Sequence, residues 1–223
     1  STVAGNDLIV SGAGNDTLDG GTGNDVIYSQ AGDEVVPGGA GGDTLAADIG
    51  NDLVDGGTGN DIIRGNEGDD TILGGDGDDS LFGGAGTNFM IGGNGADLFS
   101  GSASDLAGDT INDLTTADTI IITGADLSAL NGQAASSTIS VSGGSMSLTG
   151  ISSASGTFNA SVSGGTTTLR LVAPTTSSTS GDDDGGSTTT ETTTTTTTTN
   201  PTTPVAPAVV PVFTPAVLGT AAS

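Results

Sequence analysis

The sequence predicts an all-β chain that begins as a parallel β-solenoid, and three observations carry this prediction. A glycine recurs every nine residues from Gly5 to Gly95, and an acid or its amide follows each glycine by two residues. A large apolar residue follows two positions further on, and eleven units keep this register without an insertion. Units this short cannot bury an apolar face alone, so stacked neighbours must share one core.

Each unit predicts a glycine-rich turn followed by a short strand of about three residues, as in residues 25–28. Side chains alternate between the two faces of a strand, so a strand this short offers one inward side chain. Two units then form one coil of 18 residues, with a strand on each side and a turn at each edge. The predicted inward residues are Ile9, Leu18, Ile27, Val36, Leu45, Val54, Ile63, Ile72, Leu81, Met90 and Phe99.

An 18-residue coil sends the acids of alternate units to opposite edges, which sorts them into two rows. The first row is aspartate throughout: Asp7, Asp25, Asp43, Asp61, Asp79 and Asp97. The second row is mixed: Asp16, Glu34, Asp52, Asp70 and Asn88. Ser29-Gln30 and Ala47-Asp48 also stand in this row where a glycine pair is expected. Neutral drift in a redundant array and an edge that faces a partner are both open explanations.

Residues 20–28 and 74–82 match the nonapeptide G-G-x-G-x-D-x-U-x throughout, and residues 4 to about 102 resemble the RTX calcium-binding repeats. The resemblance implies a parallel β-roll that holds Ca²⁺ between turns one coil apart, with aspartate carboxylates and glycine carbonyls as ligands. Ca²⁺ accepts roughly six to eight oxygen ligands in irregular geometry, which suits such loops. The gaps between successive turns imply up to about nine ions. The implied ligands are Asp7, Asp16, Asp25, Glu34, Asp43, Asp52, Asp61, Asp70, Asp79, Asn88, Asp97, Gly5, Gly14, Gly23, Gly41, Gly59 and Gly77.

The charge of the chain agrees with a calcium role and excludes several function classes. Its 27 acidic residues oppose two basic ones, for a net charge of -25, and it contains no His and no Cys. It therefore cannot build a Ser-His-Asp triad or a Cys- or His-based zinc site, and we expect no enzyme activity. So few cations also argue against nucleic-acid binding. Residues 1–126 carry a net charge of -22, which nine Ca²⁺ ions would reduce to about -4.

A disordered polyanion is the usual interpretation of such a composition, but the repeat opposes it. After the roll (1–102), residues 103–174 predict a β-rich cap, which closes the open end of the solenoid. The stretches 108–114 and 126–130 resemble the flank that follows the roll in many RTX proteins. Period-two alternation and paired glycines predict an antiparallel meander, with strands near 138–142, 145–149, 157–163 and 166–172.

The C-terminal part changes composition twice. Residues 175–204 are rich in Thr and Ser and predict an extended or disordered linker. Residues 205–223 are apolar but interrupted by Pro207, Pro211 and Pro215, which argues against a membrane span. Two interpretations of this tail are open: a C-terminal secretion signal, and an extended strand that docks on a neighbouring subunit. We find no signal peptide, and the start within a repeat suggests a fragment or a processed product.

These observations lead to one functional expectation and one alternative. The expected function is a secreted, extracellular structural module of a bacterial cell surface, such as a surface layer, filament, sheath or adhesin, which folds on binding Ca²⁺. Its expected partners are copies of itself or other cell-surface components, without nucleic acid. The alternative is the calcium-binding C-terminal module of a type I-secreted toxin or hydrolase, whose catalytic part is missing. Ice binding is disfavoured, because no flat rank of Thr and Asn repeats along one edge.

Overall fold

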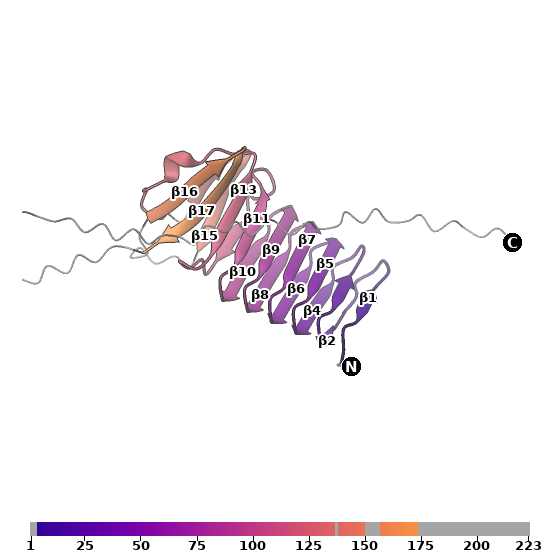
Figure 1. The fold of residues 1–223 in the computed structure, drawn as a ribbon. Coiled ribbons are helices and arrows are strands. Elements are labelled where there is room, and N and C mark those ends of the chain that lie inside the picture. Colours follow the sequence, from indigo (N-terminus) through magenta and orange to yellow (C-terminus); the bar gives the residue numbers. More distant parts are fainter. Residues whose placement is uncertain (1–3, 137, 150–156, 174–223) are drawn as a thin grey trace, which may run out of the picture. The chain divides into compact units, whose positions relative to one another are not determined.

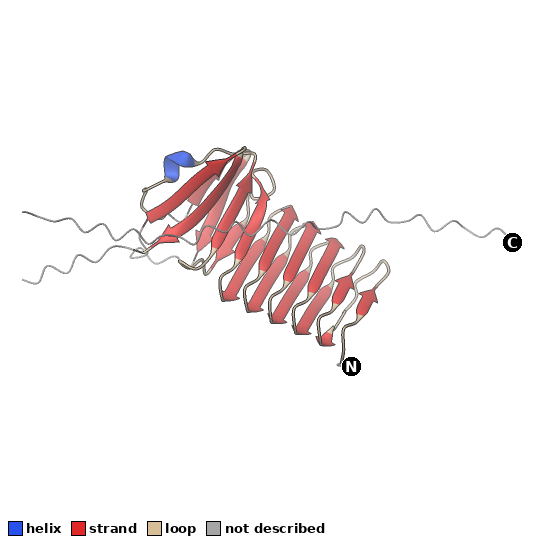
Figure 2. Ribbon diagram, viewed as in Figure 1, coloured by secondary structure: helices blue, strands red, loops and turns tan. Residues whose placement is uncertain are grey.

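The computed structural model describes residues 4–136, 138–149 and 157–173, and within them the chain is all-β (Figures 1 and 2). One short 3₁₀ turn, η1 (Ser128–Leu130), interrupts the strands. Among these residues no helix is long and apolar enough to cross a membrane. The predictions for residues 175–204 and 205–223 fall outside the described residues.

The repeats form two parallel sheets that face each other, as predicted for a solenoid (Figure 1). Alternate strands of the roll belong to alternate sheets. One sheet contains β1 (Leu8–Val10), β3 (Val26–Tyr28), β5 (Thr44–Ile49), β7 (Ile62–Glu67), β9 (Ser80–Ala85) and β11 (Leu98–Ser102). The other contains β2 (Gly21–Thr22), β4 (Val35–Ala40), β6 (Leu53–Thr58), β8 (Thr71–Asp76) and β10 (Phe89–Asn94).

Strand pairing confirms a coil of 18 residues. Val54 of β6 lies opposite Ile72 of β8, and Ile63 of β7 lies opposite Leu81 of β9. Hydrogen bonds continue this register through the turns, where the Gly41 N–H donates to the Thr58 carbonyl at 2.7 Å. Every coil is therefore bonded to the next along its whole length.

The strands are longer than predicted, because six residues form each strand from β4 to β10. The prediction of three residues was right only for short strands such as β1 and β3. The longer strands run on through the glycine pairs, and Gly39 and Gly57 remain paired across the ladder despite positive φ angles. Glycine tolerates this backbone conformation without leaving the sheet.

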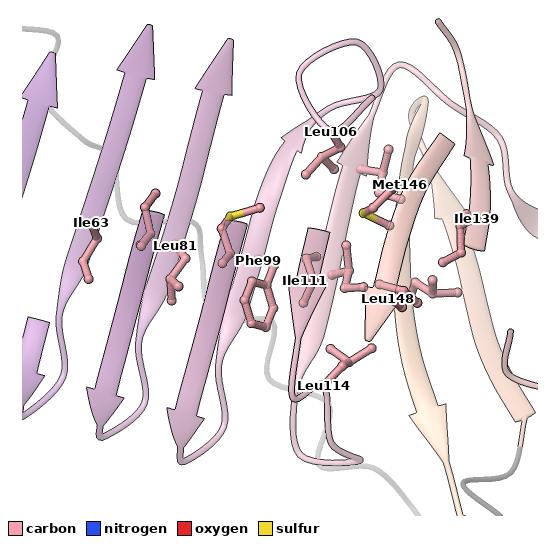
Figure 3. Packing of buried hydrophobic residues seen from close by; sticks show 14 of the residues in the cluster. Ile63, Leu81, Phe99, Leu106, Ile111, Leu114, Ile139, Met146 and Leu148 are labelled. Atoms are coloured by element: carbon pink, nitrogen blue, oxygen red, sulfur yellow. The ribbon is translucent and has the colours of Figure 1, made fainter. Parts of the chain in front are cut away.

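The predicted inward residues form the core of the roll, shown in close-up in Figure 3. From Ile27 to Phe99 each of them has no exposed surface, while Ile9 and Leu18 of the first coil pack against the core and keep some exposure. One apolar side chain per strand thus fills the narrow space between the two sheets.

The cap continues both sheets. β12 (Thr110–Asn112) pairs with β10, and β13 (Thr119–Thr123) pairs with β11, both in parallel. The four later strands lie close to their predicted positions: β14 (Thr138–Val141), β15 (Gly144–Thr149), β16 (Thr157–Ser163) and β17 (Thr166–Val172). The predicted single meander is wrong, because β14–β15 extends one sheet and β16–β17 extends the other. Each sheet of the roll ends in a strand with unpaired backbone groups, and a separate hairpin of the cap extends each sheet at that end.

Candidate metal sites

The first-row acids lie at the edge of the roll and link successive coils. Each precedes by one residue a strand of the sheet that contains β1 to β11 in odd numbers. The backbone N–H of Asp25 donates to Oδ1 of Asp43 at 2.7 Å, and the N–H of Asp43 donates to Oδ1 of Asp61 at 2.7 Å. The same bond runs from Asp61 to Asp79 at 2.8 Å. These side chains are buried, with about 1% exposure. One oxygen of each carboxylate is thus used to hold the preceding coil.

The second oxygen of these carboxylates has no hydrogen-bond donor. Across the described residues, ten acidic side chains have a buried oxygen without a partner: Asp7, Asp25, Glu34, Asp43, Asp52, Asp61, Asp70, Asp79, Asp97 and Asp109. A buried and unpaired carboxylate oxygen is costly, because it has lost water and gained no replacement. An array of such oxygens fits a bound cation.

The glycine pairs bring oxygen atoms of adjacent coils close together. We call this place a cradle: it lies beside the first glycine of a pair, between the carboxylate five residues later and the glycine carbonyl one coil later. A methyl group at Gly56 would collide with both Oδ2 of Asp61 and the Gly74 carbonyl oxygen, each 2.5 Å away. Only glycine therefore lets these two oxygens converge, and carboxylate and carbonyl oxygens are the ligands that Ca²⁺ prefers.

Each cradle relies on main-chain oxygens as well as a carboxylate. In the part of the chain that the structure describes, no group of three or more acidic side chains is arranged to hold a metal ion. The sequence analysis did not name Gly38, Gly56 or Gly74, whose carbonyl oxygens border the cradles. The signal was present, because these glycines open the G-G of the nonapeptide.

The glycines that the sequence analysis did name, such as Gly41 and Gly59, lie in the turns with φ of +128° and +119°. A side chain on Gly59 would collide with the carbonyl of Gly41, so these glycines allow adjacent turns to approach closely. The same holds for Gly23 and Gly77, whereas Gly14 has open space around it. Their predicted role as metal ligands stays a prediction.

A second ladder, exposed to solvent, runs along each edge in the opposite direction. The N–H of Asp78 donates to Oδ1 of Asn60 at 3.1 Å, and the N–H of Asp69 donates to Oδ1 of Asn51 at 2.9 Å. Here a side chain accepts from the following coil, whereas the buried acids accept from the preceding one. Successive coils are therefore tied in both directions, which explains the Asn or Asp that precedes most of the buried acids.

The second row is also brought together, but its members differ. Glu34 N–H donates to Oδ1 of Asp52 at 2.8 Å, and Asp52 N–H donates to Oδ1 of Asp70 at 2.9 Å. Asp16, in the first coil, is only half-buried. Asn88 accepts from the N–H of Asp70 through Oδ1, at 3.0 Å, and its Nδ2 donates at the place where an aspartate presents its free oxygen.

Two acids in the cap continue the rows, and the sequence analysis did not include them among the ligands. The N–H of Asn88 donates to Oδ1 of Asp109 at 2.8 Å, and the N–H of Asp97 donates to Oδ1 of Asp118 at 2.9 Å. Both acids are buried. Each begins an Asp-Thr-Ile sequence that repeats the acid-x-apolar spacing of the roll, so the signal was in the sequence. The insertion of three residues in each coil hid the match.

The crowded carboxyls hold their protons more strongly than usual. Burial raises the pKa of Asp61 to about 7, and the carboxylates of Asp79 and Asp43 add to the shift. Burial raises the pKa of Glu34 to about 7 as well, helped by Asp52. Burial also raises the pKa of three further carboxyls to about 6: Asp70, Asp97 and Asp109. The metal-free roll thus disfavours its own ionised form.

We expect the stability of the metal-free protein to fall as the pH rises from about 4 to about 7. In this window the folded chain binds more protons than the unfolded chain, whose aspartates titrate near about 3.9. The stabilisation of the folded state by these extra protons is therefore fully present below about pH 4, and it is lost as the pH passes the raised pKa values. Circular dichroism in calcium-free buffer measures the change as the β-sheet content at pH 4.5 compared with that at pH 7.5.

Calcium reverses this trend, because the cation must displace the protons and binds more tightly at higher pH. Saturating Ca²⁺ is accordingly the control, in which stability is expected to be greater at pH 7.5. Equal stability of the metal-free protein at the two pH values would contradict the expectation.

Comparison with known families agrees with the geometry of the sites. The family model of the RTX calcium-binding nonapeptide repeat (4 copies) matches residues 1–36, 37–72 and 64–99. No curated protein matches the chain. The family match ends at Phe99 of β11, so it covers the roll and leaves the cap unmatched.

Proposed function

Since residues 1–99 are RTX calcium-binding nonapeptide repeats, we propose that the chain is a secreted structural module of a bacterial cell surface that folds on binding Ca²⁺. One observation carries the calcium part of the proposal: buried carboxylate oxygens without a hydrogen-bond partner recur in successive coils, close to glycine carbonyls of the next coil. Bound Ca²⁺ supplies the positive charge that offsets the buried carboxylates and joins adjacent coils.

The distribution of charge supports folding that depends on the metal. Residues 1–126 carry a net charge of -22, with Arg64 as their one basic residue, so the coils repel each other when no cation is bound. The chain has no cysteine, so no disulfide can stabilise it outside the cell. Bound calcium is the stabilising interaction that remains, and calcium is scarce inside cells and plentiful outside. A chain of this kind stays unfolded during export and folds afterwards.

Calcium-dependent folding is expected to be visible directly by circular dichroism. Addition of 5 mM Ca²⁺ to chelated protein at pH 7.5 should produce the β-sheet spectrum, since binding free energy becomes folding free energy. Mg²⁺ at the same concentration is the control, because it demands a tighter octahedral shell and should produce little change. A β-sheet spectrum that is the same with and without chelator would refute the proposal.

The surface role requires a separate experiment on the native producer. We propose copies of the chain or other cell-surface components as its partners, and surface layers, filaments, sheaths and adhesins are the assemblies considered. Immunogold labelling of intact cells, before and after washing with chelator, tests both location and calcium dependence. Label confined to the interior of the cells would exclude the surface role.

A further inference from the structure

The outer faces of the two sheets carry almost no charge, although the chain is strongly acidic. The residues before and after each inward side chain point away from the core, since neighbouring side chains on a strand alternate between its faces. We call the outward residues of β3, β5, β7, β9 and β11 the odd face: Val26, Tyr28, Thr44, Ala46, Ile62, Arg64, Ser80, Phe82, Leu98 and Ser100. Those of β4, β6, β8 and β10 form the even face: Val35, Pro37, Leu53, Asp55, Thr71, Leu73, Phe89 and Ile91.

Each face contains a single charged residue, and the two charges are opposite. Arg64 is the third residue of β7 and Asp55 is the third residue of β6, so both lie near the middle of their strands. The further acids in the strands of the two faces lie toward the far ends, next to the turns: Asp48, Glu67 and Asp76. The centre of the odd face is therefore positive and the centre of the even face negative.

Arg64 is held in place by its own face. Its Cζ lies 4.2 Å from the centre of the Phe82 ring, and its cross-strand neighbours in the sheet are Ala46 and Phe82. Neither neighbour is acidic, so the ladder places no carboxylate beside this arginine. A guanidinium stacked on an aromatic ring still presents N–H groups along its edge, in a geometry that matches a carboxylate. Arg64 is thus preorganised to meet a carboxylate from outside its own sheet.

Apolar side chains surround both charges and are open to solvent. On the even face Val35, Leu53 and Phe89 are 41%, 42% and 37% exposed, and on the odd face Tyr28 is 41% exposed. Aromatic residues and arginine are enriched where proteins bind each other. Five strands roughly 4.8 Å apart and about 20 Å long present about 500 Å² on each partner, which reaches the lower range of specific interfaces.

The two charges determine which faces can meet. A two-fold contact between odd faces would bury two Arg64 side chains without an acid, and one between even faces would bury two Asp55 side chains without a base. A buried charge without a partner is costly, whereas an opposite pair that forms hydrogen bonds gives specificity. Only the odd face against the even face brings Arg64 to Asp55.

We propose that copies of the chain stack face to face, with the odd face of one copy on the even face of the next and Arg64 donating to Asp55 of that neighbouring copy. This inference rests on the proposed surface role and names a second copy as the partner. The two faces lie on opposite sides of the roll, so each contact leaves one face of each copy open and the contact repeats without closing. Rolls stacked in this way form an extended array, as a filament or a surface layer requires.

Charge reversal in the calcium-bound protein tests the contact. Sedimentation velocity should show wild-type assemblies that grow beyond a dimer as the concentration rises. Arg64→Glu and Asp55→Arg should each weaken association by at least about thirtyfold, since each brings like charges together in the contact. Arg170→Glu is the matched control, because it makes the same change of charge at an exposed residue of β17 in the cap, and it should leave assembly unchanged.

An equimolar mixture of the two single variants provides the sharpest measurement. In the mixture, the reversed odd face of Arg64→Glu matches the reversed even face of Asp55→Arg, and the two unchanged faces also match. Alternating stacks should therefore form from two proteins that do not assemble alone. A recovery of this kind cannot arise from misfolding, and circular dichroism of the same samples checks that each variant folds with Ca²⁺.

The outcomes separate this inference from the proposed function. A wild-type protein that stays monomeric, a dimer that does not grow, or a mixture that does not recover assembly would overturn the stacking. In each of these cases a β-sheet spectrum induced by Ca²⁺ would still support the calcium-dependent fold. A wild-type chain that gains no β-sheet on addition of Ca²⁺ would overturn the proposed function itself.

Discussion

Replacement of Gly57 by alanine is expected to destabilise the calcium-bound roll by about 3 kcal/mol. Gly57 adopts a φ of +98°, a conformation that residues with a side chain avoid. In addition, a methyl group at this position would collide with the carbonyl oxygen of Gly39 in the neighbouring coil. Backbone cannot move aside as a flexible side chain can, because Gly39 and Gly57 are paired within the sheet. Urea unfolding in saturating Ca²⁺ measures the loss.

Two other glycines separate the contributions to this effect. Gly14 has a φ of +119° but open space around it, so Gly14→Ala should show the conformational cost alone, about 1–2 kcal/mol. Gly12 has neither a positive φ nor a neighbour within reach, and Gly12→Ala should change stability by less than about 0.5 kcal/mol. Equal losses in all three variants would contradict the role given to close packing between coils.

Replacement of Phe99 by alanine is expected to cost about 3–5 kcal/mol, the usual effect of removing a buried aromatic side chain. Phe99 has no exposed surface and lies between Leu81 of β9 and Ile120 of β13 in the sheet register. It therefore joins the last coil of the repeat to strand β13 of the cap, and Figure 3 shows it beside Ile111 of β12. Loss of this ring should weaken the roll and the cap together.

Phe89 provides the matched control, since it belongs to the neighbouring coil but points outward and is 37% exposed. Phe89→Ala should lower the free energy of unfolding by no more than about 1 kcal/mol, because removal of a ring on the surface leaves no buried cavity. Thermal unfolding followed by circular dichroism in saturating Ca²⁺ compares the two variants. A similar loss in both would show that the ring of Phe99 is not a structural link.

The cap is joined to the roll by the same interactions that join one coil to the next. Asp109 and Asp118 accept hydrogen bonds from Asn88 and Asp97, as Asp43, Asp61 and Asp79 do from the coil before each of them. β12 and β13 also pair in parallel with the last strands of the roll. The end of the nine-residue period at about residue 102 is therefore a change in sequence pattern and not a break in the sheets or the core.

The sequence by itself determined the coil, its inward residues and its two rows of acids. A nine-residue repeat is a local property, so the spacing of Gly59, Asp61 and Ile63 already implies a turn, an edge position and a core position. The residues that depart from the pattern, Ser29, Ala47 and Asn88, were visible as well. Their effect on the fold was not visible, and both neutral drift and a partner-facing edge were open explanations.

Only the tertiary structure showed which oxygen atoms of neighbouring coils converge. A cradle is formed by a glycine, a carboxylate five residues later and a carbonyl one coil later, as at Gly56, Asp61 and Gly74. The surroundings of Ala47 likewise depend on atoms 18 residues away along the chain, because its strand pairs with that of Gly65. The division of the cap strands between two sheets has the same origin, because a hairpin pairs with whichever open edge lies beside it. Spacing reveals the repeat, but the space between two coils exists only once they are stacked.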